Sequence, residues 1–213
     1  MPPSFSLTRM LWACALAGAL MLGCVPTRTP ATRFYLLTPL APGQGLVADG
    51  EAREPLSIEI ASLHLPQYLE RPQIVLQSSR NRLELAEFDQ WGGNLRKNMM
   101  RVLAKNLSQL LATPRVSISP YSPQGSPDYR VELTVMNFER DPGGRVRLCV
   151  QWRLSGGGDR GPLGTQVTDL ASPVVPTGPD LEPTVSAMSA LLGELSRLIA
   201  QTLWNDVQGR PAP

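Results

Sequence analysis

The sequence predicts an α/β protein in which a mixed β-sheet packs against two long amphipathic helices. Alternating apolar and polar residues, typical of half-buried strands, occur at 56–61 and 129–138. Apolar residues three and four positions apart, typical of a helix with one buried face, occur at 94–112 and again after Asp180. The order is strands, helix, strands, helix. We therefore expect hairpins to supply antiparallel pairs and helices to cover the faces of the sheet.

The first half of this pattern contains four expected strands and the first helix. The strands are expected at 33–39, where Pro39 stops the first, and at 56–61, 73–77 and 82–88. The segment 40–55 has the glycines and prolines of a loop, and 63–72 contains too many prolines for a long helix. Residues 78–81 are expected to form a hairpin turn, and Pro114 ends the helix.

The second half contains the strands that complete the sheet and the second helix. Strands are expected at 115–119, 129–138, 145–154 and 164–170, with turns at 141–144 and 155–158. Asp180 is expected to cap the last helix, whose first turn tolerates Pro183. We expect one domain from 33 to 208 and a disordered tail at 209–213.

The N-terminus has the features of an exported lipoprotein. Arg9 is followed by thirteen residues without a charge, a length typical of a signal peptide and short for a bilayer span. The stretch ends Leu20-Met-Leu-Gly-Cys24, which resembles the bacterial lipobox. We expect a signal peptide at 1–23, diacylglyceryl and N-acyl groups such as palmitate on Cys24, and a tether at 24–32. The alternative is an uncleaved membrane helix in which Cys24 is incidental.

The remaining cysteines and the net charge exclude several classes of protein. Cys14 is lost with the signal peptide, so Cys149 has no partner for a disulfide when Cys24 is acylated, and we expect it to be a small buried side chain. The mature chain has 19 basic and 18 acidic side chains, a net charge of +1, because cleavage removes only Arg9. This balance argues against nucleic-acid binding.

The residues of an enzyme or a metal site are lacking. His64 is the only histidine, and no nucleophile elbow lies near it, which disfavours a serine hydrolase. One histidine and one spare cysteine are too few for a zinc site. The glycines at 156–158 lack the lysine of a phosphate-binding loop. We therefore expect a protein that is not an enzyme and has no cofactor besides its covalent lipid.

Two segments are more distinctive. They are Leu65-Pro-Gln-Tyr-Leu-Glu-Arg-Pro-Gln-Ile-Val75 and Ala86-Glu-Phe-Asp-Gln-Trp91. In this order they resemble the auxiliary lipoproteins of the paraquat-inducible (Pqi) type, the PqiC/YmbA-like family, over nearly the whole mature chain. A departure is Gly92-Gly-Asn94, where relatives more often have Ala-x-Pro.

The resemblance implies a fold and a role. Family members share a three-layer α/β sandwich with a mixed sheet, similar to an anticodon-binding domain and to the domain that precedes the Tol-system propeller. They lie in the periplasm, usually on the outer membrane, and meet the MCE-domain protein of an ABC transport system that moves lipids and supports envelope integrity. Val25 follows the anchor where Asp would retain a lipoprotein in the inner membrane, which favours the outer membrane.

Tyr68, Arg71 and Trp91 are the candidate partner-binding residues. Tyrosine, tryptophan and arginine are enriched in interface hot spots, and two prolines frame the loop that carries Tyr68 and Arg71. The alternative is that these side chains serve local packing. A rival function is a carrier that holds an acyl chain in a cavity beneath the helices. The subunit number, including a homo-oligomer, stays open.

Overall fold

The computed structural model describes residues 30–46, 55–120, 126–158, 161–176, 178 and 180–209. Contacts divide the chain into two units, Met1–Ala31 and Thr32–Pro213, and the second contains the described strands and helices. The predicted signal peptide, Cys24, most of the tether and residues 210–213 lie outside the described residues. None of the described helices has the length and apolar character that a bilayer crossing requires.

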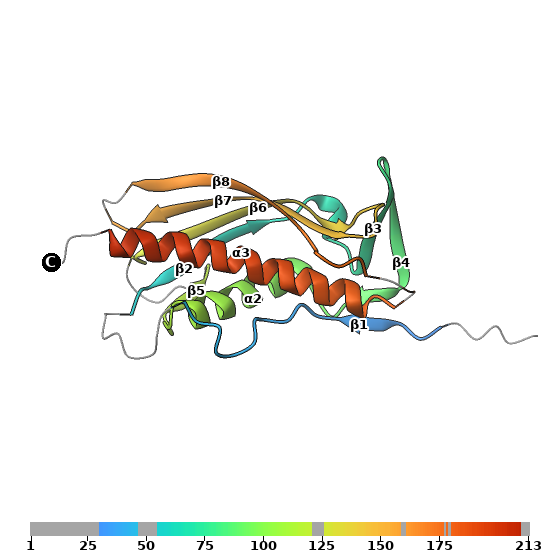
Figure 1. The fold of residues 1–213 in the computed structure, drawn as a ribbon, viewed down its shortest axis with the longest axis horizontal. Coiled ribbons are helices and arrows are strands. Elements are labelled where there is room, and N and C mark those ends of the chain that lie inside the picture. The colour runs from blue at the N-terminus through green and yellow to red at the C-terminus, as the bar shows by residue number, and fades with distance from the viewer. Residues whose placement is uncertain are drawn as a thin grey trace, which may run out of the picture. The chain divides into compact units, whose positions relative to one another are not determined.

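The described strands form one mixed sheet (Figure 1). They are β1 (Arg33–Tyr35), β2 (Ile58–His64), β3 (Gln73–Ser79), β4 (Arg82–Trp91), β5 (Val116–Ile118), β6 (Tyr129–Arg140), β7 (Val146–Gly156) and β8 (Pro162–Ala171). Their order is β1-β4-β3-β6-β2-β5, and β7 and then β8 lie on the other side of β6. The hairpins β3–β4, β6–β7 and β7–β8 are antiparallel, while β2 is parallel to β5 and β6.

Strands β2 and β3 both pair with the same edge of β6. Strand β2 pairs with its first half, from Tyr129 to Thr134, and β3 meets it at Arg140. The connection between β2 and β3 therefore lies beside β6, between Thr134, where the pairing with β2 ends, and Arg140, where β3 pairs. This connection holds the short 3-10 helix η2 (Gln67–Leu69), in agreement with the expectation that 63–72 forms no long helix.

Two helices cover the sheet, α2 (Leu95–Leu110) and α3 (Glu182–Gln208). The side chain of Asn94 caps α2 by accepting the Lys97 N–H at 3.0 Å. Leu181 occupies the N-cap position of α3, but Asp180 Oδ1 still accepts the Glu182 N–H at 3.1 Å. Both helices are found where periodicity predicted them, within two residues of the expected ends of α2.

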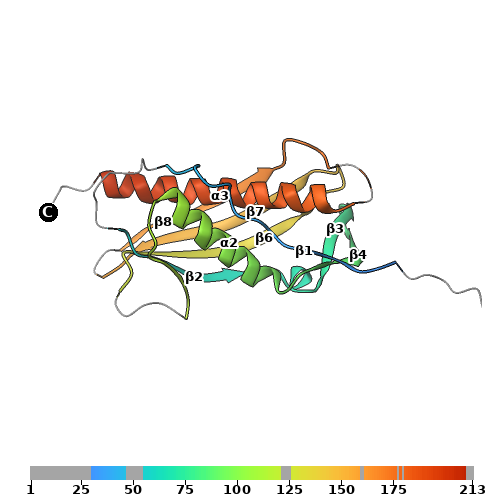
Figure 2. The ribbon, with the colours of Figure 1, turned by 90° about the horizontal axis from the view of Figure 1, so that it is seen from below.

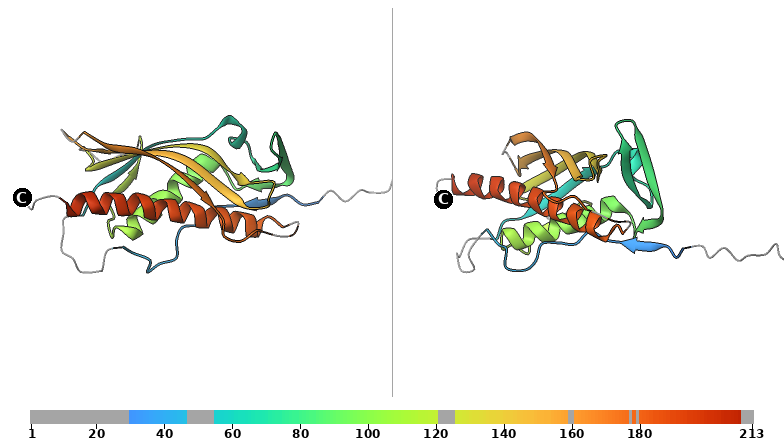
Figure 3. Two further views of the ribbon diagram at one scale, coloured as in Figure 1. Left: turned by 45° about the horizontal axis from the view of Figure 1, so that its top comes forward. Right: turned by 45° about the vertical axis from the view of Figure 1, so that its right-hand side comes forward.

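The two helices lie on the same face of the sheet, although we expected helices to cover its faces (Figure 3). The residues of β6 and β7 that alternate toward the helices are buried, and those between them are mostly exposed. The exposed residues include Arg130, Glu132 and Arg153. The α/β class, the mixed sheet and the two helices are confirmed, and one face of the sheet is open and polar.

A third layer is formed by the N-terminal segment 36–46, which runs along the outer side of the two helices (Figure 2). Strand β1 is shorter than the expected strand 33–39 because the chain beyond Tyr35 no longer pairs with a strand. Its main-chain N–H groups bind helix side chains instead: Leu37 donates to Asn98, Thr38 to Ser189 and Leu40 to Asn106. These bonds explain why Asn98 and Asn106 of α2 and Ser189 of α3 are buried, since buried polar groups need partners.

Candidate docking site

The loop between β2 and β3 has a fixed backbone. Leu69 N–H donates to the Pro66 carbonyl at 2.9 Å, and the Trp91 N–H donates to the Pro72 carbonyl at 2.8 Å. The Leu69 side chain is buried and fastens the loop to the core. The two segments that resemble the Pqi-type family therefore meet at the Pro72–Trp91 hydrogen bond.

Tyr68 is half-buried and joins this loop to β6. Its hydroxyl donates to Glu139 Oε2 at 2.9 Å, and the same oxygen accepts the Phe138 N–H at 2.7 Å. Burial raises the pKa of Glu139, while its bonds with Phe138 and Tyr68 act in the opposite direction. Burial and the Glu139 carboxylate raise the pKa of Tyr68 well above its usual range. Tyr68 is therefore a neutral donor to a buried carboxyl group.

The other two candidate residues are placed differently from each other. Arg71 is exposed, and no carboxylate of the described chain lies within ion-pair distance of it. Trp91 is only 5% exposed and belongs to the hydrophobic core. A partner can thus reach Arg71 and the open edge of Tyr68, whereas the Trp91 indole lies behind them.

Glu139→Gln is expected to raise the stability of the protein or leave it unchanged at neutral pH. The glutamine oxygen can accept the same two hydrogen bonds, while the cost of a buried charge disappears. Folding raises the pKa of Glu139 above about 4.5, so its stabilising contribution is complete below that pH and is lost as the pH rises through the folded pKa. Thermal melts should therefore show the wild type losing stability relative to the variant as the pH rises above about 4.5. A difference that stays constant over this range would contradict the prediction.

A second polar cluster fastens the N-terminal strand to the domain. Asp89 Oδ1 accepts the Arg33 Nε–H at 2.7 Å and the Tyr35 hydroxyl at 2.8 Å. Asp180 accepts the same hydroxyl at 3.3 Å, so the cluster also reaches the start of α3. Burial and the hydrogen bond to Asp89 raise the pKa of Tyr35 to about 12. Sequence reasoning missed this cluster, because its members lie 54 to 145 residues apart.

His64 and Cys149 lie apart from the loop, on the open face of the sheet. His64 is exposed and borders a shallow polar hollow with Glu132, Gln151 and Arg153. Cys149 is half-buried rather than fully buried, and its Sγ lies 3.9 Å from Met136 Sδ. Burial raises the pKa of the Cys149 thiol, which disfavours the reactive thiolate. Among the described residues, no three His, Cys, Asp or Glu side chains are grouped to hold a metal ion.

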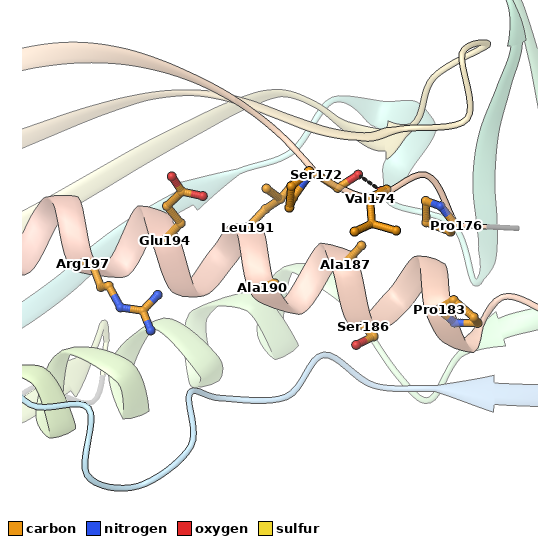
Figure 4. A pocket seen from close by; sticks show the side chains of 11 residues that line it. Ser172, Val174, Pro176, Pro183, Ser186, Ala187, Ala190, Leu191, Glu194 and Arg197 are labelled. Carbon is orange, nitrogen blue, oxygen red and sulfur yellow. Dashed lines mark hydrogen bonds between the residues drawn. The ribbon is translucent and has the colours of Figure 1, made fainter.

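A groove lies on the surface of α3 (Figure 4). It has a volume of about 710 Å³ and is bounded by α3 and by the connection from β8. Its lining is mainly apolar and includes Val174, Pro176 and Ala187, while Glu194 and Arg197 lie at one end. The rival hypothesis expected a cavity beneath the helices, but this groove is at the surface.

Comparisons place the fold among solved structures. A crystal structure of an uncharacterized protein has a TM-score of 0.63 and 18% identity, covering 82% of this chain and 99% of its own. Protein XCC0632 from Xanthomonas campestris, of the family DUF330, has a TM-score of 0.63 and 15% identity, covering 83% and 99%. These likenesses show the shared fold.

Sequence comparison identifies the family. A comparison with curated protein sequences finds no significant match. The family model described as the ABC-type transport auxiliary lipoprotein component matches residues 35–200, which include nearly the whole folded domain and both distinctive segments. The chain therefore belongs to the ABC-type transport auxiliary lipoprotein family.

Proposed function

We propose that this protein is a lipid-anchored periplasmic component of an MCE-type ABC transport system, which it docks at the outer membrane. In this role it supports lipid transport between the membranes and the integrity of the envelope. The observation that carries the proposal is the family match over residues 35–200, downstream of the predicted lipobox at Cys24. The Pro72–Trp91 hydrogen bond supports it, because it joins the two family-like segments in the fold.

The docking surface that we propose is the loop 65–72, with Arg71 as its contact residue. A loop whose backbone is already fixed loses little conformational entropy when a partner binds. The Arg71 guanidinium is exposed and can pair with a carboxylate or with carbonyl groups of the MCE-domain protein. Tyr68 holds the loop against Glu139 and offers its exposed edge beside Arg71. We do not include Trp91 in the contact because it is buried.

Arg71→Ala is expected to weaken binding of the MCE-domain partner without changing the melting temperature. A hot-spot side chain contributes on the order of 2 kcal/mol, which is about thirtyfold in affinity. Tyr68→Ala is expected to weaken binding as well, but to lower the melting temperature too, since Glu139 loses a hydrogen-bond donor. Melting and pulldown on the same purified variants provide the measurement.

Arg80→Ala is the matched control, because Arg80 is also an exposed arginine and lies in the turn between β3 and β4, outside the loop. It should bind the partner as the wild type does. Normal binding by both Arg71→Ala and the folded fraction of Tyr68→Ala would rule out the loop as a docking surface.

The groove on α3 favours a second candidate function, in which the domain carries an acyl chain. Its volume and apolar lining suit a lipid tail, although it is open to solvent along α3. Native mass spectrometry of the purified protein separates the two candidates. A carrier retains lipid, whereas a docking component has the mass of the acylated chain alone.

A further inference from the structure

Helix α2 carries a concentration of positive charge. Its sixteen residues include Arg96, Lys97, Arg101 and Lys105 and no acidic residue. Helix α3 has the opposite balance, with three acidic residues and only Arg197 as a basic one. The net charge of the mature chain is close to zero, but the charged side chains of α2 are all positive.

Lys97, Arg101 and Lys105 follow one another at four-residue steps along one exposed side of α2, and Arg96 lies in its first turn. All four are exposed, while the opposite side of the helix, which includes Leu95, Met99 and Leu103, is buried. In the part of the chain that the structure describes, none of the four lies within ion-pair distance of a carboxylate. By contrast, three exposed arginines of the β-strands each form an ion pair with an acidic residue: Arg130, Arg147 and Arg153.

Two exposed apolar side chains lie in β1 and directly after it, where the chain reaches α2. Phe34 is 67% and Leu36 is 50% exposed, and they alternate with the buried Tyr35 and Leu37. Their side chains therefore point to the side of the chain opposite the buried Tyr35 and Leu37. The Leu37 N–H donates to Asn98 at 2.8 Å, which places this segment directly against α2. Figure 2 shows the chain that follows β1 running beside α2, with the sheet on the other side of the helices.

Phe34 and Leu36 lie close in sequence to the predicted lipid anchor at Cys24. Nine residues, 24–32, separate β1 from the end of the predicted signal peptide and include the predicted lipid anchor. A chain of nine residues spans at most about 30 Å even when fully extended. If Cys24 is acylated, β1 with Phe34 is therefore held within about 30 Å of a membrane, and Leu36 follows it directly.

We propose that the basic side of α2, together with Phe34 and Leu36, lies against a lipid surface that contains anionic headgroups. Basic side chains near an anionic membrane attract it, and exposed aromatic and aliphatic side chains insert at the boundary of headgroups and acyl chains. A covalent lipid combined with a polybasic surface anchors more firmly than the lipid alone. This inference rests on the proposed anchoring through Cys24, but not on the identity of the transport partner.

The test uses the mature chain, residues 24–213, with Cys24→Ser, so that the folded domain alone contacts the vesicles. Its core lies entirely within residues 35–203. The probes are vesicles of phosphatidylcholine with 30 mol% phosphatidylglycerol and vesicles of pure phosphatidylcholine. We expect cosedimentation with the anionic vesicles only, and loss of binding at 1 M salt, where the screening length is about 3 Å. Arg101→Gln/Lys105→Gln should lower binding by on the order of tenfold or more, and Phe34→Thr should also lower it.

Arg80→Gln/Arg145→Gln is the matched control. It removes the same charge from exposed turns of the sheet, and it should bind the anionic vesicles as the unmodified mature chain does. Melting temperatures should be equal for all these variants, because exposed substitutions change stability little.

Equal binding to both kinds of vesicle, an equal loss in the control, or no vesicle binding at all would overturn the proposal. So would an α2 variant that binds vesicles normally but fails to bind the MCE-domain partner, since α2 would then contact a protein. Loss of partner binding by Arg71→Ala tests the docking proposal separately.

Discussion

Leu103→Ala and Leu195→Ala are each expected to lower the free energy of unfolding by about 2–5 kcal/mol. Both side chains are completely buried, in the middle of α2 and of α3. The helices are held between the sheet and the N-terminal segment, so neighbouring residues can move only partly into the cavity that the truncation leaves. For a domain of this size, the loss corresponds to a fall in the melting temperature of roughly 4–20 °C.

Leu198→Ala is the control for this prediction. Leu198 lies on the same helix as Leu195 but is 37% exposed, so its truncation should change the free energy of unfolding by less than about 1 kcal/mol. Chemical denaturation of the three variants and the wild type gives the comparison. Equal stability of Leu195→Ala and Leu198→Ala would mean that the assigned faces of α3 are wrong.

The helices and hairpins could be predicted from the sequence because each has a signal that is local in the chain. Helix α2 buries one side and exposes the other, which produces the spacing of three and four residues. Strands β6 and β7 alternate between buried and exposed residues and are joined by the turn at 141–144. Pairing and turn chemistry together fix their register.

Other features of the fold depend on contacts between distant residues and had no local signal. The division of one edge of β6 between β2 and β3 is set by tertiary packing. The same holds for the placement of both helices on one face. Asn98 and Asn106 interrupt the apolar stripe of α2, and only the structure shows that they bind the main chain of Leu37 and Leu40. A polar residue at an inward position is thus a signal that an extended segment lies beside the helix.

The candidate site was predictable to a similar extent. Pro66 and Pro72 indicated a rigid connection, and the structure confirms that its backbone is held by hydrogen bonds. The sequence did not reveal that Tyr68 binds Glu139, because 71 residues separate them. It also gave no means of separating the exposed Arg71 from the buried Trp91, since both residue types occur in interfaces and in cores. The charges of α2 are visible in the sequence, but only the structure shows that no carboxylate of the described residues lies within ion-pair distance of them.

Cys24→Ala is expected to abolish lipidation and with it membrane attachment through the acyl chains. The thiol of Cys24 is the proposed acceptor of the diacylglyceryl group, and alanine offers no nucleophile in its place. Each buried CH2 contributes roughly 0.8 kcal/mol to membrane anchoring, so removing even one long acyl chain costs far more than the basic surface of α2 can replace. Metabolic labelling with a palmitate analogue should give no signal from the variant, which should accumulate as precursor or as a soluble product.

Cys14→Ala and Cys149→Ala are the matched controls for this experiment. Cys14 lies in the predicted signal peptide, and Cys149 lies half-buried on β7 with its Sγ beside Met136. Neither thiol is expected to carry lipid, so both variants should be labelled as strongly as the wild type. Undiminished label in Cys24→Ala would contradict the lipobox assignment. It would also remove the reason for placing Phe34 and α2 near a membrane, because no covalent anchor would then hold β1 within reach of one.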